Sequence, residues 1–86
     1  MKIIIFIKQA DTNDTKLSQL CTHLSDRLLA YQIINVESAV EPIEVQAYDI
    51  TSTPSVVVAR DDGVATKTWR HHLPSVDQVA YALGNI

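Results

Sequence analysis

The sequence predicts an α/β domain in which a four-stranded mixed sheet lies between helices, in the order β-α-β-α-β-β-α. Three features support this prediction: an apolar run near the start, a segment with helical apolar spacing behind it, and a second apolar run that follows a proline. The chain has 86 residues, of which 47% are hydrophobic and 20% charged. This length suffices for one core and not for two, so residues 1–86 are expected to form a single domain.

The first half of the chain has the pattern of a β-α-β unit. Residues 3–7 are apolar without alternation, which is typical of a strand covered on both faces. Residues 11–14 supply candidate N-cap side chains for a helix that should reach about Tyr31. Its apolar face would comprise Leu17, Leu20, Cys21, Leu24 and Leu28. Residues 33–36 form the next strand, parallel to the first because a helix separates them.

A short helix and a third strand should follow. Glu41-Pro42 begins a helical segment to about Tyr48, because a proline in the first turn lacks only an N–H that would have no partner there. Pro54 then precedes the strand over residues 55–59. It can donate no ladder hydrogen bond, so it belongs at the entry of that strand.

The last segment predicts a hairpin and a final helix. The turn signal at residues 61–63 indicates that a strand over residues 64–69 pairs antiparallel with residues 55–59. Ser75 to Gln78 matches a capping box, which begins a helix that ends at Gly84. Its buried face would comprise Val76, Val79, Ala80 and Leu83.

Charge and cysteine usage disfavour several classes of function. The net charge of −3 includes no cluster of Lys or Arg, so binding to nucleic acid or to an anionic membrane is not expected. The apolar run at residues 3–7 is too short for a signal peptide. The single cysteine, Cys21, can form no internal disulfide. A cytoplasmic protein without a cofactor is the resulting expectation.

The element order, with an X-Pro bond that opens the third strand, resembles the thioredoxin-like fold in its short, glutaredoxin-sized form. The run from Tyr48 through Thr53-Pro54 and the strand behind it is similar to the thioredoxin segment around its cis-proline. This resemblance covers nearly the whole chain and implies three layers, α/β/α. It also implies a cis Thr53–Pro54 bond and a Thr53 backbone that faces an extended substrate.

The chain departs from that family where the redox motif C-x-x-C would stand. An ungapped comparison places Thr12-Asn13-Asp14-Thr15 there, with hydroxyls in place of both thiols. Disulfide exchange requires a thiolate, and a threonine hydroxyl stays protonated at neutral pH. The carboxylates of Asp11 and Asp14 would also occupy the positive end of the helix, where a negative charge is favoured.

These residues predict a redox-inactive thioredoxin-fold module that binds a protein or peptide and is not an enzyme. The expected binding surface around the cis-proline comprises Thr12, Asn13, Asp14, Thr15, Thr53, Pro54 and His71. At this surface His71 could act as a general base beside a threonine, or simply be an exposed loop residue. The segment His71 to Ser75 replaces the glycines that glutaredoxins use for glutathione, so glutathione is not expected as a ligand. Two adjacent histidines rarely converge on one metal ion, so no metal site is predicted.

Two alternatives remain open at this level. Cys21 could serve as the single thiol of an atypical glutaredoxin-like oxidoreductase, although its place on the apolar helix face favours a small buried hydrophobe. Trp69 closes the predicted edge strand. It could pack under the last helix, or it could anchor a partner, including a second copy of the chain in a homodimer through that edge.

Overall fold

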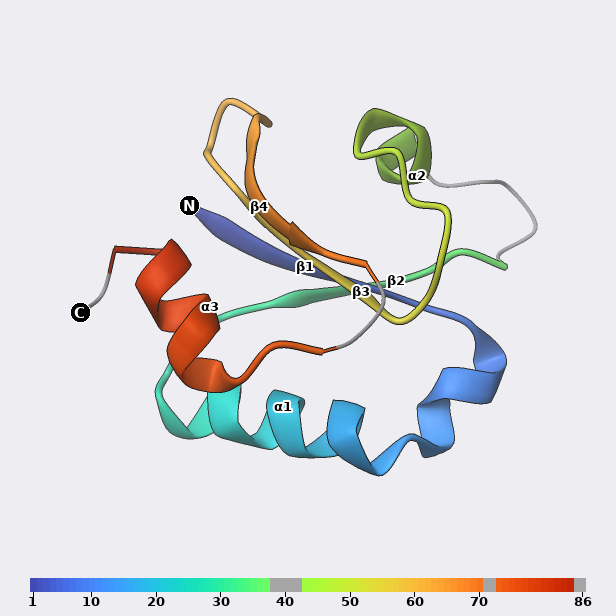
Figure 1. Ribbon diagram of the computed structural model, residues 1–86, viewed down its shortest axis with the longest axis horizontal. Helices are drawn as coiled ribbons and strands as arrows, with labels where there is room; N and C mark the ends of the chain where they lie inside the picture. Colours follow the sequence, from blue (N-terminus) through green and yellow to red (C-terminus); the bar gives the residue numbers. More distant parts are fainter. Residues whose placement is uncertain (38–42, 71–72, 85–86) are drawn as a thin grey trace.

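Within the described residues, four strands form one mixed sheet with helices on both of its faces (Figure 1). The computed structural model describes residues 1–37, 43–70 and 73–84. Its elements are β1 (Lys2–Ile7), the 3-10 helix η1 (Gln9–Asn13), α1 (Thr15–Asp26), β2 (Gln32–Asn35), α2 (Ile43–Ala47), β3 (Ser55–Ala59), β4 (Ala65–Trp69) and α3 (Val76–Ala82). The predicted order of strands and helices is confirmed, with the addition of η1.

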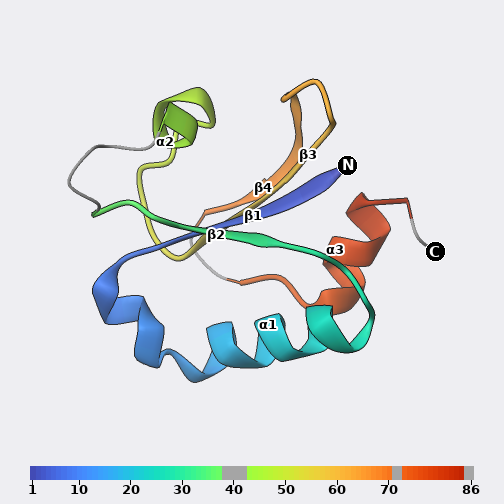
Figure 2. The same ribbon diagram turned by 180° about the vertical axis from the view of Figure 1, so that it is seen from behind.

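The strands lie in the order β2-β1-β3-β4. β1 pairs in parallel with β2, as the crossover through α1 requires, and antiparallel with β3. β3 pairs antiparallel with β4, and a register shift interrupts this ladder between Val58 and Ala59. The helices α1 and α3 cover one face of the sheet and α2 lies on the other, in both views (Figures 1 and 2). The three-layer α/β/α architecture is therefore confirmed.

The two central strands are buried because alternate side chains serve two cores. Ile3, Ile5 and Ile7 of β1 pack with α1 and α3, whereas Ile4 and Phe6 pack beneath α2. β3 divides its side chains between the two cores in the same way. This arrangement explains why both segments are apolar without alternation.

No helix within the described residues is long and apolar enough to cross a membrane.

The C-terminus of α1 differs from the predicted one. The helix ends at Asp26 and not near Tyr31, because Leu28 adopts a left-handed conformation with φ of 59°. The Leu28 N–H donates to Ser25 O at 3.0 Å and the Leu29 N–H donates to Leu24 O at 2.9 Å, which is a Schellman motif. Leu28 is consequently 92% exposed, so its prediction as a residue of the buried helix face was wrong.

Replacement of Leu28 by glycine should stabilise the protein by about 0.5–1 kcal/mol, because a left-handed backbone is costly for any residue with a Cβ. Little packing is lost, since this side chain is almost fully exposed. The measurement is urea unfolding followed by circular dichroism. Leu28→Ala keeps the Cβ and should change the free energy of unfolding far less. Equal stabilisation by the glycine and alanine variants would show that backbone strain at this position is not the cause.

The second half of the chain follows its predicted pattern closely. Ser75 caps α3 in a capping box, in which the Gln78 N–H donates to Ser75 Oγ at 3.2 Å and the Ser75 N–H donates to Gln78 Oε1 at 2.9 Å. Gly84 follows α3 with φ of 79°. Residues Glu41 and Pro42, predicted to begin α2, lie outside the described residues.

The hairpin between β3 and β4 is held by local contacts. The Arg60 N–H donates to Val64 O at 2.9 Å, and Gly63 provides the positive φ of 90° that the turn requires. A hydrogen bond from the Arg60 guanidinium and a second from the Val64 N–H lower the pKa of Asp62. Asp62 thus belongs to turn chemistry, whereas Asp61 Oδ1 accepts from the N-terminal ammonium of Met1 at 2.8 Å.

Candidate functional site

The N-terminal end of β3 and the C-terminal end of β1 meet at one end of the sheet. The antiparallel register sets Phe6 opposite Ser55. Pro54 therefore lies beside the exit from β1 into η1, and the Thr53–Pro54 peptide bond is cis, the isomer that the resemblance implies. This end of the sheet carries both the cis-proline and the segment that precedes α1.

The residues at the position of the redox motif are engaged in the backbone of this segment. The Thr12 hydroxyl donates to Gln9 O at 2.8 Å within η1, and Asn13 is the last residue of η1. Asp14 is the N-cap of α1, and Thr15 is its first residue. The Thr12 hydroxyl thus closes a turn of the 3-10 helix.

The carboxylate of Asp14 occupies the start of α1, as the sequence predicts, whereas that of Asp11 lies at the start of η1. Asp14 Oδ1 accepts from the Lys16 N–H at 2.8 Å and from the Leu17 N–H at 3.3 Å. Asp11 Oδ2 accepts from the N–H of Lys8, the N-cap of η1, at 2.8 Å, so the prediction that Asp11 also occupies the start of α1 was wrong. The positive end of α1, which lowers the pKa of a thiol in redox enzymes, is here satisfied by a side chain of the helix itself.

The segment before β3 is tied to the end of β4 by two serine hydroxyls. Ser52 Oγ donates to Arg70 O at 2.6 Å. Ser55 Oγ, fully buried, lies 2.6 Å from Ser52 O and 3.3 Å from Arg70 O. These contacts hold Thr53 and Pro54 between fixed points. Sequence analysis did not identify either serine, although a buried serine at the start of an apolar strand is a signal that its hydroxyl has a backbone partner.

A cleft of about 210 Å³ opens beside Thr53 on the α2 side of the sheet. It is lined by Lys8, Val36, Val45, Ile50, Thr51, Ser52 and Thr53. Thr53 is partly buried, and its backbone N–H and C=O make no hydrogen bond among the described residues. The structure thus brings Thr53 together with the end of β1, whereas residues 12–15 do not line this cleft.

The remaining candidates lie elsewhere. His71 and His72 fall outside the described residues, so a role for His71 stays a prediction. Cys21 lies in the middle of α1 and is partly buried against the core that α1 and α3 share. The helical pattern predicts full burial, so Cys21 is more exposed than expected. Among the described residues, no three His, Cys, Asp or Glu side chains are grouped as metal ligands would be.

Comparison with known proteins places this geometry in a fold. No protein-family model and no curated protein sequence matches the chain. Among solved structures, thioredoxin 1 from the thermophilic eubacterium Thermosipho africanus TCF52B is similar, with a TM-score of 0.70 and 18% sequence identity. The similarity covers 98% of this chain and 91% of that thioredoxin. The chain therefore has the thioredoxin-like fold.

Proposed function

We propose that this protein is a redox-inactive thioredoxin-fold module that binds an extended segment of another protein at its cis-proline surface. This surface comprises Thr12 to Thr15, Thr53, Pro54 and, as predicted from the sequence, His71. The observation that carries the proposal is the backbone of Thr53 beside the cis bond, which has no hydrogen-bond partner in the described part of the chain. An extended ligand can pair with these two groups as an added strand does.

The network around Thr53 supports binding because it restrains the site before a ligand arrives. Ser52 and Ser55 link this segment to Arg70, so the backbone of Thr53 is flanked by hydrogen-bonded residues. A site that is ordered in advance loses less conformational entropy on binding. The apolar side chains of Val36, Val45 and Ile50 in the adjacent cleft would accept an apolar side chain of the ligand.

The chemistry at the start of α1 supports redox inactivity. Exchange needs a thiolate nucleophile and a group that resolves the mixed disulfide. Residues 12–15 hold no sulfur, and the carboxylate of Asp14 takes the place where helix N–H groups would stabilise a thiolate. Cys21 lies farther along α1 and packs against the hydrophobic core.

The redox part of the proposal is tested by insulin reduction with dithiothreitol and by a glutathione-disulfide assay. The purified protein should accelerate neither reaction above the rate without protein. Cys21→Ala should behave identically. Turnover by the wild type that is lost in Cys21→Ala would instead identify the protein as a single-cysteine oxidoreductase.

The binding part is tested by a quantitative pull-down from a lysate of the source organism. Thr53→Arg should reduce recovery of the specific partners about tenfold, because a large charged side chain would block pairing at the centre of the site. Thr22→Arg makes the same change at an exposed position of α1 and serves as the matched control. Partners that persist on Thr53→Arg would show that the binding surface lies elsewhere.

A further inference from the structure

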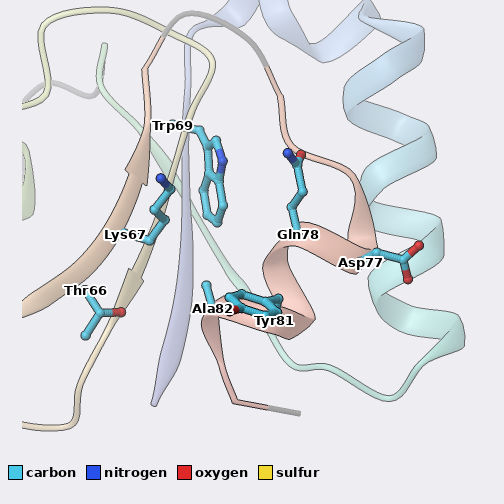
Figure 3. Close-up of a pocket in the computed structure, with 7 residues that line it drawn as sticks. All are labelled: Thr66, Lys67, Trp69, Asp77, Gln78, Tyr81 and Ala82. Atoms are coloured by element: carbon cyan, nitrogen blue, oxygen red, sulfur yellow. The ribbon is translucent and has the colours of Figure 1, made fainter. Parts of the chain in front are cut away.

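A larger groove lies between β4 and α3, on the opposite face of the sheet from the cleft beside Thr53 (Figure 3). Its volume is about 650 Å³, and its lining residues are Thr66, Lys67, Trp69, Asp77, Gln78, Tyr81 and Ala82. The Trp69 ring extends from the strand, and the Tyr81 ring from the helix (Figure 3). Trp69 is partly buried against the core, whereas Tyr81 is 68% exposed. The groove therefore has an aromatic wall on each side.

The strand beside this groove is an edge of the sheet among the described strands. An edge strand presents one row of backbone N–H and C=O groups without a partner strand. Trp69 pairs with Val56, which belongs to the core beneath α1 and α3, whereas Thr68 pairs with Val57 of the opposite core. Lys67 and Trp69 thus face the groove, and Thr68 faces the other side of the sheet.

The groove presents a positive charge. Lys67 Nζ lies 5.8 Å from the centroid of the Trp69 ring and forms no salt bridge within the described part of the chain. Asp77, the acidic residue of the lining, is paired with Arg27 and points away from Trp69 (Figure 3). A ligand in the groove consequently meets a cation above an aromatic surface and no free carboxylate from this lining.

We infer that the β4 edge binds an extended segment of another protein by strand addition, and that this segment carries an acidic and a large apolar residue two positions apart. The added strand would pair with the free backbone groups of β4. Because side chains alternate along a strand, the ligand residues opposite Lys67 and Trp69 have one residue between them. The carboxylate would contact Lys67, and the apolar side chain would lie between Trp69 and Tyr81.

A second copy of the chain is a poorer occupant than an acidic segment. The described edge strands β2 and β4 have the sequences QIIN and ATKTW, and neither holds a carboxylate. Antiparallel pairing of two β4 strands centred on Lys67 would set the two lysines directly opposite each other, which is destabilising. Charge complementarity therefore favours a different, acidic partner. This inference concerns a separate surface and does not depend on the proposed cis-proline site.

The test uses labelled synthetic nonapeptides, acetylated and amidated, of sequence Thr-Val-Thr-Glu-Thr-X-Thr-Val-Thr, with X as Phe, Tyr or Leu. Fluorescence polarisation measures binding at concentrations up to about 1 mM, where edge pairing of a short strand should be detectable. Trp69 is the only tryptophan, so a change in its emission reports occupation of the groove. At least one of the three peptides should bind and change this emission.

Charge exchange gives the decisive comparison. Lys67→Glu should weaken binding of the Glu peptide about fivefold. It should strengthen, by a similar factor, binding of the same peptide with Lys in place of Glu, as expected for an exposed charge pair. Tyr81→Ser should weaken binding about tenfold. Thr53→Arg should leave binding of the peptides unchanged, which distinguishes this surface from the cis-proline site. The inference is overturned if none of the peptides binds, if Lys67→Glu binds Glu and Lys peptides alike, or if light scattering gives a dimer that Thr68→Pro dissociates.

Discussion

Phe6→Ala is expected to lower the free energy of unfolding by about 3–5 kcal/mol. Phe6 is fully buried in the central strand β1, beneath α2. Its ring meets that of Tyr48 edge to face, with centroids 6.4 Å apart and an interplanar angle of 60°. Alanine would remove both the apolar burial and this aromatic contact and would leave a cavity between the sheet and α2.

The effect is large against the whole stability of the protein. Domains of this kind unfold with a free energy of about 5–15 kcal/mol, so the substitution would remove a substantial part of it. Urea unfolding followed by circular dichroism gives the midpoint and the slope. Ile43→Ala truncates a side chain of α2 that is 78% exposed and should change stability by less than about 0.5 kcal/mol. A loss below about 1 kcal/mol for Phe6→Ala would mean that α2 contributes little to this core.

The central strands could be predicted from the sequence because burial on both faces leaves a direct trace in composition. Residues 55–59 were predicted to the residue, since Pro54 fixes the entry and the apolar run fixes the length. The final helix was predicted equally well, because its capping box is a local signal that needs no tertiary context. Both predictions rest on signals from residues that are adjacent in the sequence.

The misplaced end of α1 shows where local pattern fails. Leu28 continues the apolar spacing of Leu24, but two hydrogen bonds of the Schellman motif end the helix at this point. The usual signal for such an end is glycine, and leucine gives none. The spacing of apolar residues therefore predicted one face of α1 correctly and its length wrongly.

The sites were predicted unevenly for the same reason. The carboxylate cap of Asp14 on α1 follows from sequence position alone, whereas Asp11 caps η1, a 3-10 helix that the sequence pattern did not predict. The link from Ser55 to Arg70 and the groove between Lys67 and Tyr81 join residues from different elements. No spacing rule relates such residues, so only the packed structure reveals them.

Ser55→Ala should lower the free energy of unfolding by about 1–3 kcal/mol, although it removes a single oxygen atom. The hydroxyl is fully buried and donates to Ser52 O at 2.6 Å, so alanine would leave that carbonyl without this donor. Arg70 O would lose a longer contact of 3.3 Å and keep its bond from Ser52 Oγ. The loss of hydrogen bonding should therefore be concentrated between residue 52 and the cis bond.

Local measurements distinguish this effect from a general loss of packing. Amide hydrogen exchange should accelerate near Thr53 and at the start of β3 more than in α1, because the lost bond restrains only that segment. Ser18→Ala removes an exposed hydroxyl on α1 and should leave both stability and exchange near Thr53 unchanged. Uniform acceleration throughout the sheet would contradict a local role for Ser55. If partner binding at the cis-proline surface depends on a restrained Thr53 backbone, Ser55→Ala should weaken binding without altering any residue that contacts the ligand.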